Sequence, residues 1–180
     1  MDEPIPEKAL KSRYVTVEDL VIPDRVRLIA DEPGRMTNST NFSFFTAYAR
    51  RAFRKNFYFL SVKIFDKRND PRAMDRIAAA QKDVLTVIEA LSKKHGQWLH
   101  LENTLVEKQF TNIVEICPEC TRLRQTFMKL DQFLVVPYLS KIAGVLSQPE
   151  LDKIMDEVDR LLKELISSVS IKEGAVGQTL

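Results

Sequence analysis

Apolar residues at helical spacing dominate the chain after residue 70, and they constrain its fold more than any other feature. Three segments show this spacing: 71–94, 119–143 and 149–167. Asp70 followed by Pro71 is typical of a helix start, Gly144 is typical of a helix end, and Ser147 with Glu150 matches a capping box. We therefore predict three long helices, of which the last two form an antiparallel hairpin with a loop of about three residues.

The first 70 residues carry shorter and more mixed patterns. Residues 57–65 alternate, with one uniformly apolar face and one mixed face that includes Ser61 and Lys63, which predicts a strand. A helix over about 40–55 is predicted before it. Other predicted strands and loops are 14–17, 25–30 and 105–116 (strands) and 31–41 (a polar loop). The expected fold class is α+β, with a small antiparallel sheet or ribbon, a predominantly helical core and a C-terminal antiparallel helical hairpin.

The chain of 180 residues is long enough for one domain with a sizeable core. No internal repeat is evident. The predicted organisation is a flexible tail at 1–13, a single α+β domain at 14–167 and a frayed tail at 168–180. Within the domain we expect a basic strand–helix part at 14–68 and a mainly helical part at 69–167.

Composition indicates a soluble globular protein, because 44% of the residues are hydrophobic and 29% are charged. No run of apolar residues approaches the ~18 needed for a membrane span. The acidic, proline-containing start of the chain is unlike a signal peptide, and two cysteines fit a reducing compartment. These features predict a cytoplasmic location and no membrane partner.

Positive charge is concentrated in one part of the chain, although the whole chain carries only +2. Residues 25–68 contain ten cations and three anions, a net charge of +7. Residues 149–167 contain three cations and six anions, a net charge of −3. This asymmetry favours a half that binds a polyanion joined to a solvated half, although a solvated basic face is the simpler alternative.

Few residues offer catalytic or metal-binding chemistry. Cys117 and Cys120 form a C-x-x-C at a predicted helix start, which leaves three alternatives: buried cysteines without a chemical role, a redox pair, or half of a zinc site. A zinc site needs two more ligands, and His95 and His100 lack metal-type spacing. No nucleophile motif or phosphate-binding glycine loop is present. We expect a protein that is not an enzyme, with no metal, no cofactor and no small-molecule substrate.

The basic segment supports a hypothesis of DNA binding. A two-stranded ribbon formed by residues 57–65 of two chains would fit the major groove, with Ser61 and Lys63 facing the bases. Because an isolated two-stranded ribbon is marginally stable, a homodimer would supply the second strand. The expected phosphate contacts come from flanking cations: Arg50, Arg51, Arg54, Lys55, Lys67 and Arg68. The alternative is an ordinary amphipathic strand whose aromatic residues pack on both faces.

Two segments resemble the AcaB-like transfer regulators of conjugative plasmids and integrative elements. One is NFYFLSVKIFD at 56–66, and the other is 130–166, which contains GVLS before a helix and closes on RLLKELI. The resemblance implies a ribbon-helix-helix DNA-binding protein that activates conjugative transfer genes as a dimer on double-stranded DNA. Its ribbon would be residues 57–65, or another strand such as 25–30 with the helix at 40–55 behind it. A non-enzymatic protein-interaction or scaffold module of a conjugation apparatus is the alternative function.

Overall fold

The computed structural model describes residues 20–34, 37–95 and 109–170. The elements in chain order are α1 (Asp24–Ala30), β1 (Asn38–Phe44), α2 (Ala47–Lys67), α3 (Pro71–His95), β2 (Gln109–Glu115), α4 (Pro118–Ile142) and α5 (Gln148–Ser170). β1 and β2 form a two-stranded antiparallel sheet. The fold class is therefore α+β, as predicted.

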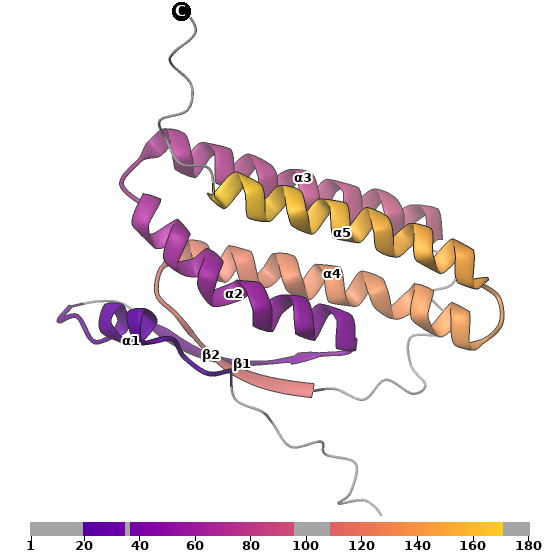
Figure 1. The fold of residues 1–180 in the computed structure, drawn as a ribbon, viewed down its shortest axis with the longest axis horizontal. Helices are drawn as coiled ribbons and strands as arrows, with labels where there is room; N and C mark the ends of the chain where they lie inside the picture. The colour runs from indigo at the N-terminus through magenta and orange to yellow at the C-terminus, as the bar shows by residue number, and fades with distance from the viewer. Residues whose placement is uncertain (1–19, 35–36, 96–108, 171–180) are drawn as a thin grey trace, which may run out of the picture.

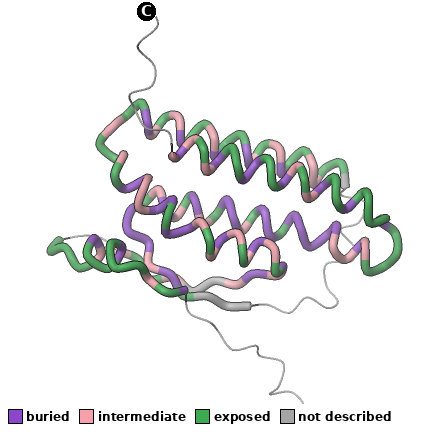
Figure 2. Tube along the Cα trace, viewed as in Figure 1, coloured by how far each residue is buried: buried purple, intermediate pink, exposed green. Residues whose placement is uncertain are grey.

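The long helices stack on one face of the sheet in two layers (Figure 1). α2 and α4 lie next to the sheet, and α3 and α5 cover them on the far side. α4 is consequently buried around much of its circumference, whereas α5 buries only one stripe, which includes Leu151, Ile154, Val158 and Leu165 (Figure 2). The predicted antiparallel hairpin of α4 and α5 is confirmed, with a connection at 143–147 that is longer than expected.

The chain contains the same strand–helix–helix order twice. β1, α2 and α3 form a first unit, and β2, α4 and α5 form a second unit. In each unit two residues separate the strand from the first helix, and the second unit begins its strand and first helix 71 positions after the first (109 against 38, and 118 against 47). The expectation that the chain has no internal repeat is therefore wrong at the level of structure.

The strand pairing obeys the same relation between the two units. Asn41 pairs with Asn112, while Thr40 pairs with Ile113 and Phe42 with Thr111. A shift of 71 positions maps Asn41·Asn112 onto itself and exchanges Thr40·Ile113 with Phe42·Thr111, so the units are related by an approximate two-fold axis through the pair Asn41·Asn112. The sequences at this point are also alike, since Thr-Asn-Phe at 40–42 corresponds to Thr-Asn-Ile at 111–113.

The predicted strand at 57–65 is wrong, because these residues form the second half of α2. Phe53, Phe57, Leu60 and Ile64 follow helical spacing and are fully buried, so burial along one side of a helix outweighs the alternating pattern. Asn56 does not end the helix, since its side-chain amide donates to the Ala52 carbonyl one turn earlier.

Other predictions before residue 70 also change. Residues 25–30 belong to α1 rather than to a strand, and β1 occupies the end of the predicted polar loop and the start of the predicted helix. The predicted strand at 105–116 is confirmed for 109–115, while 14–17 and 105–108 lie outside the described residues.

Candidate nucleic-acid interface

The two-stranded sheet has one face on the core and one face directed away from the layers formed by α2 to α5. Phe44, Ile113 and Glu115 are buried on the core face, as strand alternation requires for residues on one side of this ladder. Ser39 and Asn112 lie on the opposite face and are exposed. Serine and asparagine are side chains that can hydrogen-bond the edges of bases.

Exposed cations occur in the first turns of the helix that follows each strand. Arg51 is the fifth residue of α2 and Arg122 is the fifth residue of α4, so the 71-residue relation places them at equivalent positions. Both are exposed, and within the described residues neither forms an ion pair. Arg122 was not among the predicted site residues; only the repeat reveals its equivalence with Arg51.

The predicted phosphate-binding cations of α2 remain together at its N-terminal end. Lys55 is exposed and lies one turn beyond Arg51, whereas Arg50 and Arg54 are half-buried. The Nε of Arg50 is buried and has no hydrogen-bond partner within the described part of the chain. The exposed charge of this cluster is therefore carried by Arg51 and Lys55.

The other two predicted phosphate contacts lie at the opposite end of α2. Arg68 is about 25 Å from Arg51 along the helix axis, given a rise of about 1.5 Å per residue. The Nζ of Lys67 donates to the Val169 carbonyl at 2.7 Å, close to the end of α5. Arg68 donates to the Phe65 carbonyl at 2.7 Å, and its guanidinium lies 3.7 Å from the centre of that ring. The structure therefore does not bring these two cations into one cluster with Arg51.

The expected base-facing residues are not on a ribbon. Ser61 is fully buried on the inner side of α2. Lys63 is half-buried on the same helix, with its ammonium 5.8 Å from the centre of the Phe59 ring. The prediction that they share the outward face of a strand was wrong because residues 57–65 are helical.

Asp131 of α4 holds the junction between β1 and α2. Its carboxylate accepts hydrogen bonds from the backbone N–H of Phe45 at 2.7 Å, the backbone N–H of Thr46 at 2.9 Å and the Thr46 hydroxyl at 2.7 Å. Thr46 Oγ1 in turn accepts from the backbone N–H of Ala49, which completes the N-cap of α2. Burial raises the pKa of Asp131, although these hydrogen bonds oppose the shift.

A different arrangement holds the junction between β2 and α4. Glu115, the last residue of β2, is only 3% exposed and accepts a hydrogen bond from Arg124 Nε at 2.7 Å. The Thr121 hydroxyl donates to its other oxygen at 2.8 Å. Both partners belong to the first two turns of α4, so the strand and the helix of the second unit are joined by side chains of that same unit.

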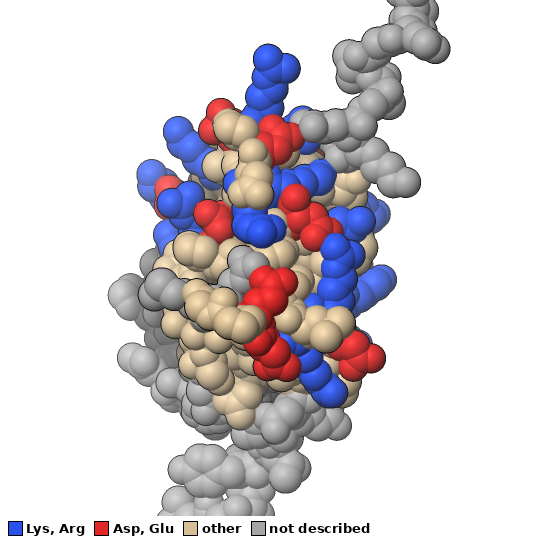
Figure 3. All heavy atoms as spheres, turned by 90° about the vertical axis from the view of Figure 1, so that its left-hand side faces the viewer, with Lys and Arg blue, Asp and Glu red and all other residues tan. Residues whose placement is uncertain are grey.

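Acidic residues are concentrated on α5, which lies in the helical layer farther from the two-stranded sheet. Arg160 pairs there with Glu157 and Glu164 on the exposed face of the helix. At the end of the bundle where α2 passes into α3, basic and acidic side chains are interspersed (Figure 3). A one-signed basic surface is therefore not present on that end of the bundle.

Comparison with known proteins finds one structural likeness. The fold is similar to that in the crystal structure of AcaB from uropathogenic E. coli, with a TM-score of 0.61 and 12% sequence identity, over 76% of this chain and 77% of that chain. At this identity the likeness shows a shared fold alone. No family model matches the chain, and no curated protein matches its sequence. None of the helices within the described residues is long and apolar enough to cross a bilayer.

Proposed function

We propose that this protein binds double-stranded DNA through the outward face of its β1·β2 ribbon and regulates transcription without being an enzyme. The observation that carries the proposal is the ribbon itself: its outward face exposes Ser39 and Asn112, and each strand–helix–helix unit presents an exposed arginine at the equivalent position of the helix that follows its strand. A two-stranded antiparallel ribbon has the dimensions to enter the major groove of B-DNA.

The two kinds of exposed residue have different roles in this proposal. Arg51 and Arg122 contact phosphates on either side of the groove and set the position of the ribbon, with Lys55 adding charge next to Arg51. Ser39 and Asn112 lie where side chains meet base edges, and the asparagine amide can donate to and accept from adenine at once. The approximate two-fold axis through Asn41·Asn112 favours a site with approximate two-fold symmetry.

The ribbon is complete within one chain, because β1 and β2 come from the two units. The earlier reason for a homodimer, a ribbon that lacks its second strand, therefore no longer applies. A homodimer remains part of the proposal only as a way to bind two neighbouring half-sites, which would raise affinity through a second set of contacts.

The proposed biological role is activation of conjugative transfer genes on a mobile element. Its support is the resemblance of two segments to AcaB-like regulators, together with a fold shared with AcaB. If the chain binds no DNA selectively, the alternative of a protein-interaction module of a conjugation apparatus takes its place.

The test is fluorescence anisotropy with labelled duplexes across a salt series, using the promoter regions beside the gene and scrambled duplexes of equal composition. We expect binding to a promoter that is roughly a thousandfold or more tighter than binding to scrambled DNA. Equal affinity for both at every salt concentration would contradict sequence-specific regulation.

A pair of variants tests which residues read the bases. Asn112→Ala should reduce the preference for the specific duplex by about 1–3 kcal/mol, because a bidentate contact to one base is lost. Lys63→Ala, on the helix rather than on the ribbon, serves as the matched control and should leave the preference unchanged. The opposite pattern would place the base-reading surface on α2.

A further inference from the structure

Cys117 and Cys120 are brought together at the junction that follows β2. Cys117 is the N-cap of α4 and Cys120 lies in its first turn. Their sulfur atoms are 3.0 Å apart, close enough for one thiol to donate a hydrogen bond to the other. Both side chains are buried and neither forms a disulfide. The two thiols therefore face each other within one short turn of chain.

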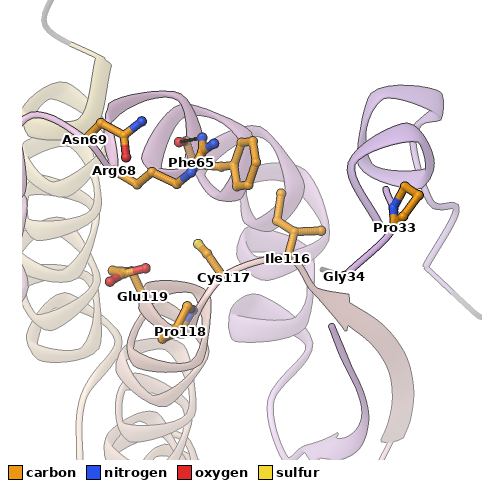
Figure 4. A pocket seen from close by; sticks show the side chains of 9 residues that line it. All are labelled: Pro33, Gly34, Phe65, Arg68, Asn69, Ile116, Cys117, Pro118 and Glu119. Carbon is orange, nitrogen blue, oxygen red and sulfur yellow. Dashed lines mark hydrogen bonds between the residues drawn. The ribbon is translucent and has the colours of Figure 1, made fainter. Parts of the chain in front are cut away.

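A hollow of about 490 Å³ reaches this pair from the surface. Its lining comes from three places in the chain (Figure 4): Pro33 and Gly34, the end of α2 with Phe65, Arg68 and Asn69, and Ile116, Cys117, Pro118 and Glu119. Cys117 is part of this lining, whereas Cys120 is not part of it and is fully buried. A water-sized oxidant can thus reach the sulfur of Cys117, and the sulfur of Cys120 lies within contact distance of it.

We propose that Cys117 and Cys120 form an oxidisable dithiol, which hydroperoxides such as hydrogen peroxide convert into an intramolecular disulfide. Cys117 attacks one peroxide oxygen, the O–O bond breaks and water leaves, which gives a sulfenic acid on Cys117. Cys120 then attacks that sulfur, the S–O bond breaks and the hydroxide leaves as a second water with the proton of Cys120. The two sulfurs lose two electrons in total, and the peroxide gains them.

The surroundings of the pair favour this chemistry over the alternatives. Either sulfur can donate the hydrogen bond that joins the pair, and when Cys120 donates it, the sulfur of Cys117 is the thiolate that attacks the peroxide. Closing the bond requires the sulfurs to approach by about 1 Å, to the usual ~2.05 Å. A zinc site needs further ligands, and the described residues contain no group of three or more His, Cys, Asp or Glu positioned around a metal. The proposal does not depend on the proposed function.

In the test, the reduced 180-residue chain is treated with hydrogen peroxide, denatured and alkylated. Its intact mass is then measured by mass spectrometry. We expect the wild type to lose both alkylatable thiols and two hydrogens without gaining oxygen, and to regain both thiols with dithiothreitol. Cys120→Ala should stop at a sulfenic acid on Cys117 that dimedone traps. Cys117→Ala should react at least about tenfold more slowly, because Cys120 is shielded.

Three results would overturn the proposal. The first is a wild type that keeps both thiols at peroxide concentrations that oxidise Cys120→Ala, and the second is a gain of oxygen without a disulfide. The third is purified protein with stoichiometric zinc that blocks both thiols. Circular dichroism on both variants establishes that each is folded before its reactivity is compared.

Discussion

The two strand–helix–helix units share one topology, but different hydrogen bonds stabilise the junction between strand and first helix in each unit. In the first unit the start of α2 is held by Asp131, which belongs to the second unit. In the second unit Glu115 is held by Arg124 and Thr121 of the helix that follows it. The first junction thus depends on assembly of the two units, while the second junction is local in sequence.

The units also differ in charge. α2 carries six cations and one anion, a net charge of +5, whereas α4 carries four cations and two anions, a net charge of +2. The comparison teaches that approximate symmetry of the backbone does not imply equal contributions to binding. On electrostatic grounds the first unit should attract a polyanion more strongly, even though each unit presents one exposed arginine at the same position.

The largest expected effect comes from the contact between the units. Asp131→Ala should lower the free energy of unfolding by about 4 kcal/mol, because three hydrogen bonds to a buried carboxylate are lost and their donors are left unsatisfied. Urea denaturation measures this loss, and hydrogen exchange should show faster exchange at the start of α2. Asp156→Ala, an exposed aspartate on α5, is the control; equal stability of the two variants would remove Asp131 from this role.

A somewhat smaller effect is expected at the local junction. Arg124→Ala should cost about 3 kcal/mol, because it leaves Glu115 buried without its charged partner. Its hydrogen-exchange signature should appear at β2 and the start of α4, and not at α2. Arg122→Ala, an exposed arginine on the same helix, should leave urea denaturation unchanged. Loosening of α2 by Arg124→Ala would show that the two junctions are not independent.

The free energy of unfolding should depend on pH through the ionisation of Asp131, which stabilises the junction of β1 and α2. The folded-state pKa of Asp131 is raised above its usual value of 3.8, so the folded chain binds more protons than the unfolded chain between these two pKa values. Stability from this group is therefore complete below 3.8 and falls as pH rises through the raised pKa. Thermal melts of Asp131→Asn should lack this decline; an unchanged pH profile would contradict it.

The smallest expected effects concern DNA, and they compare the equivalent arginines. Arg51→Gln and Arg122→Gln should each weaken binding to all duplexes and reduce the slope of log affinity against log salt by about 1, since each removes one phosphate contact. Lys163→Gln changes the charge by the same amount on α5 and should leave the slope unaltered. A loss confined to Arg51→Gln would show that only the first unit contacts the backbone.

The long helices of the C-terminal half were predictable from sequence, because their signals are local. Residues 71–94, 119–143 and 149–167 were expected, and α3, α4 and α5 agree with them to within a few residues. The capping box is partly formed as predicted, since Glu150 accepts from the backbone N–H and the hydroxyl of Ser147. Caps and helical apolar stripes act within a few turns, so neighbouring residues contain the information.

Sequence alone predicted β2 and Arg51, but it predicted neither β1 nor Arg122. The aromatic run at 57–65 satisfies both an alternating and a helical pattern, and only packing of Phe57, Leu60 and Ile64 against the rest of the core decides between them. One signal was available, since Thr-Asn followed by an apolar residue occurs at 40–42 and again at 111–113. A search for repeats at that spacing would have indicated the strand pair and, with it, Arg122.

Local patterns in the sequence specify where the amphipathic helices of this protein run and show that its positive charge is concentrated in residues 25–68. The pairing of strands 71 positions apart, the burial of Ser61, the exposure of Arg51 and the meeting of two thiols beside a hollow depend on the three-dimensional packing. The physical reason is that strand pairing and burial are contacts between residues distant in the chain. Their free energy depends on which surfaces meet, and no local pattern contains that information.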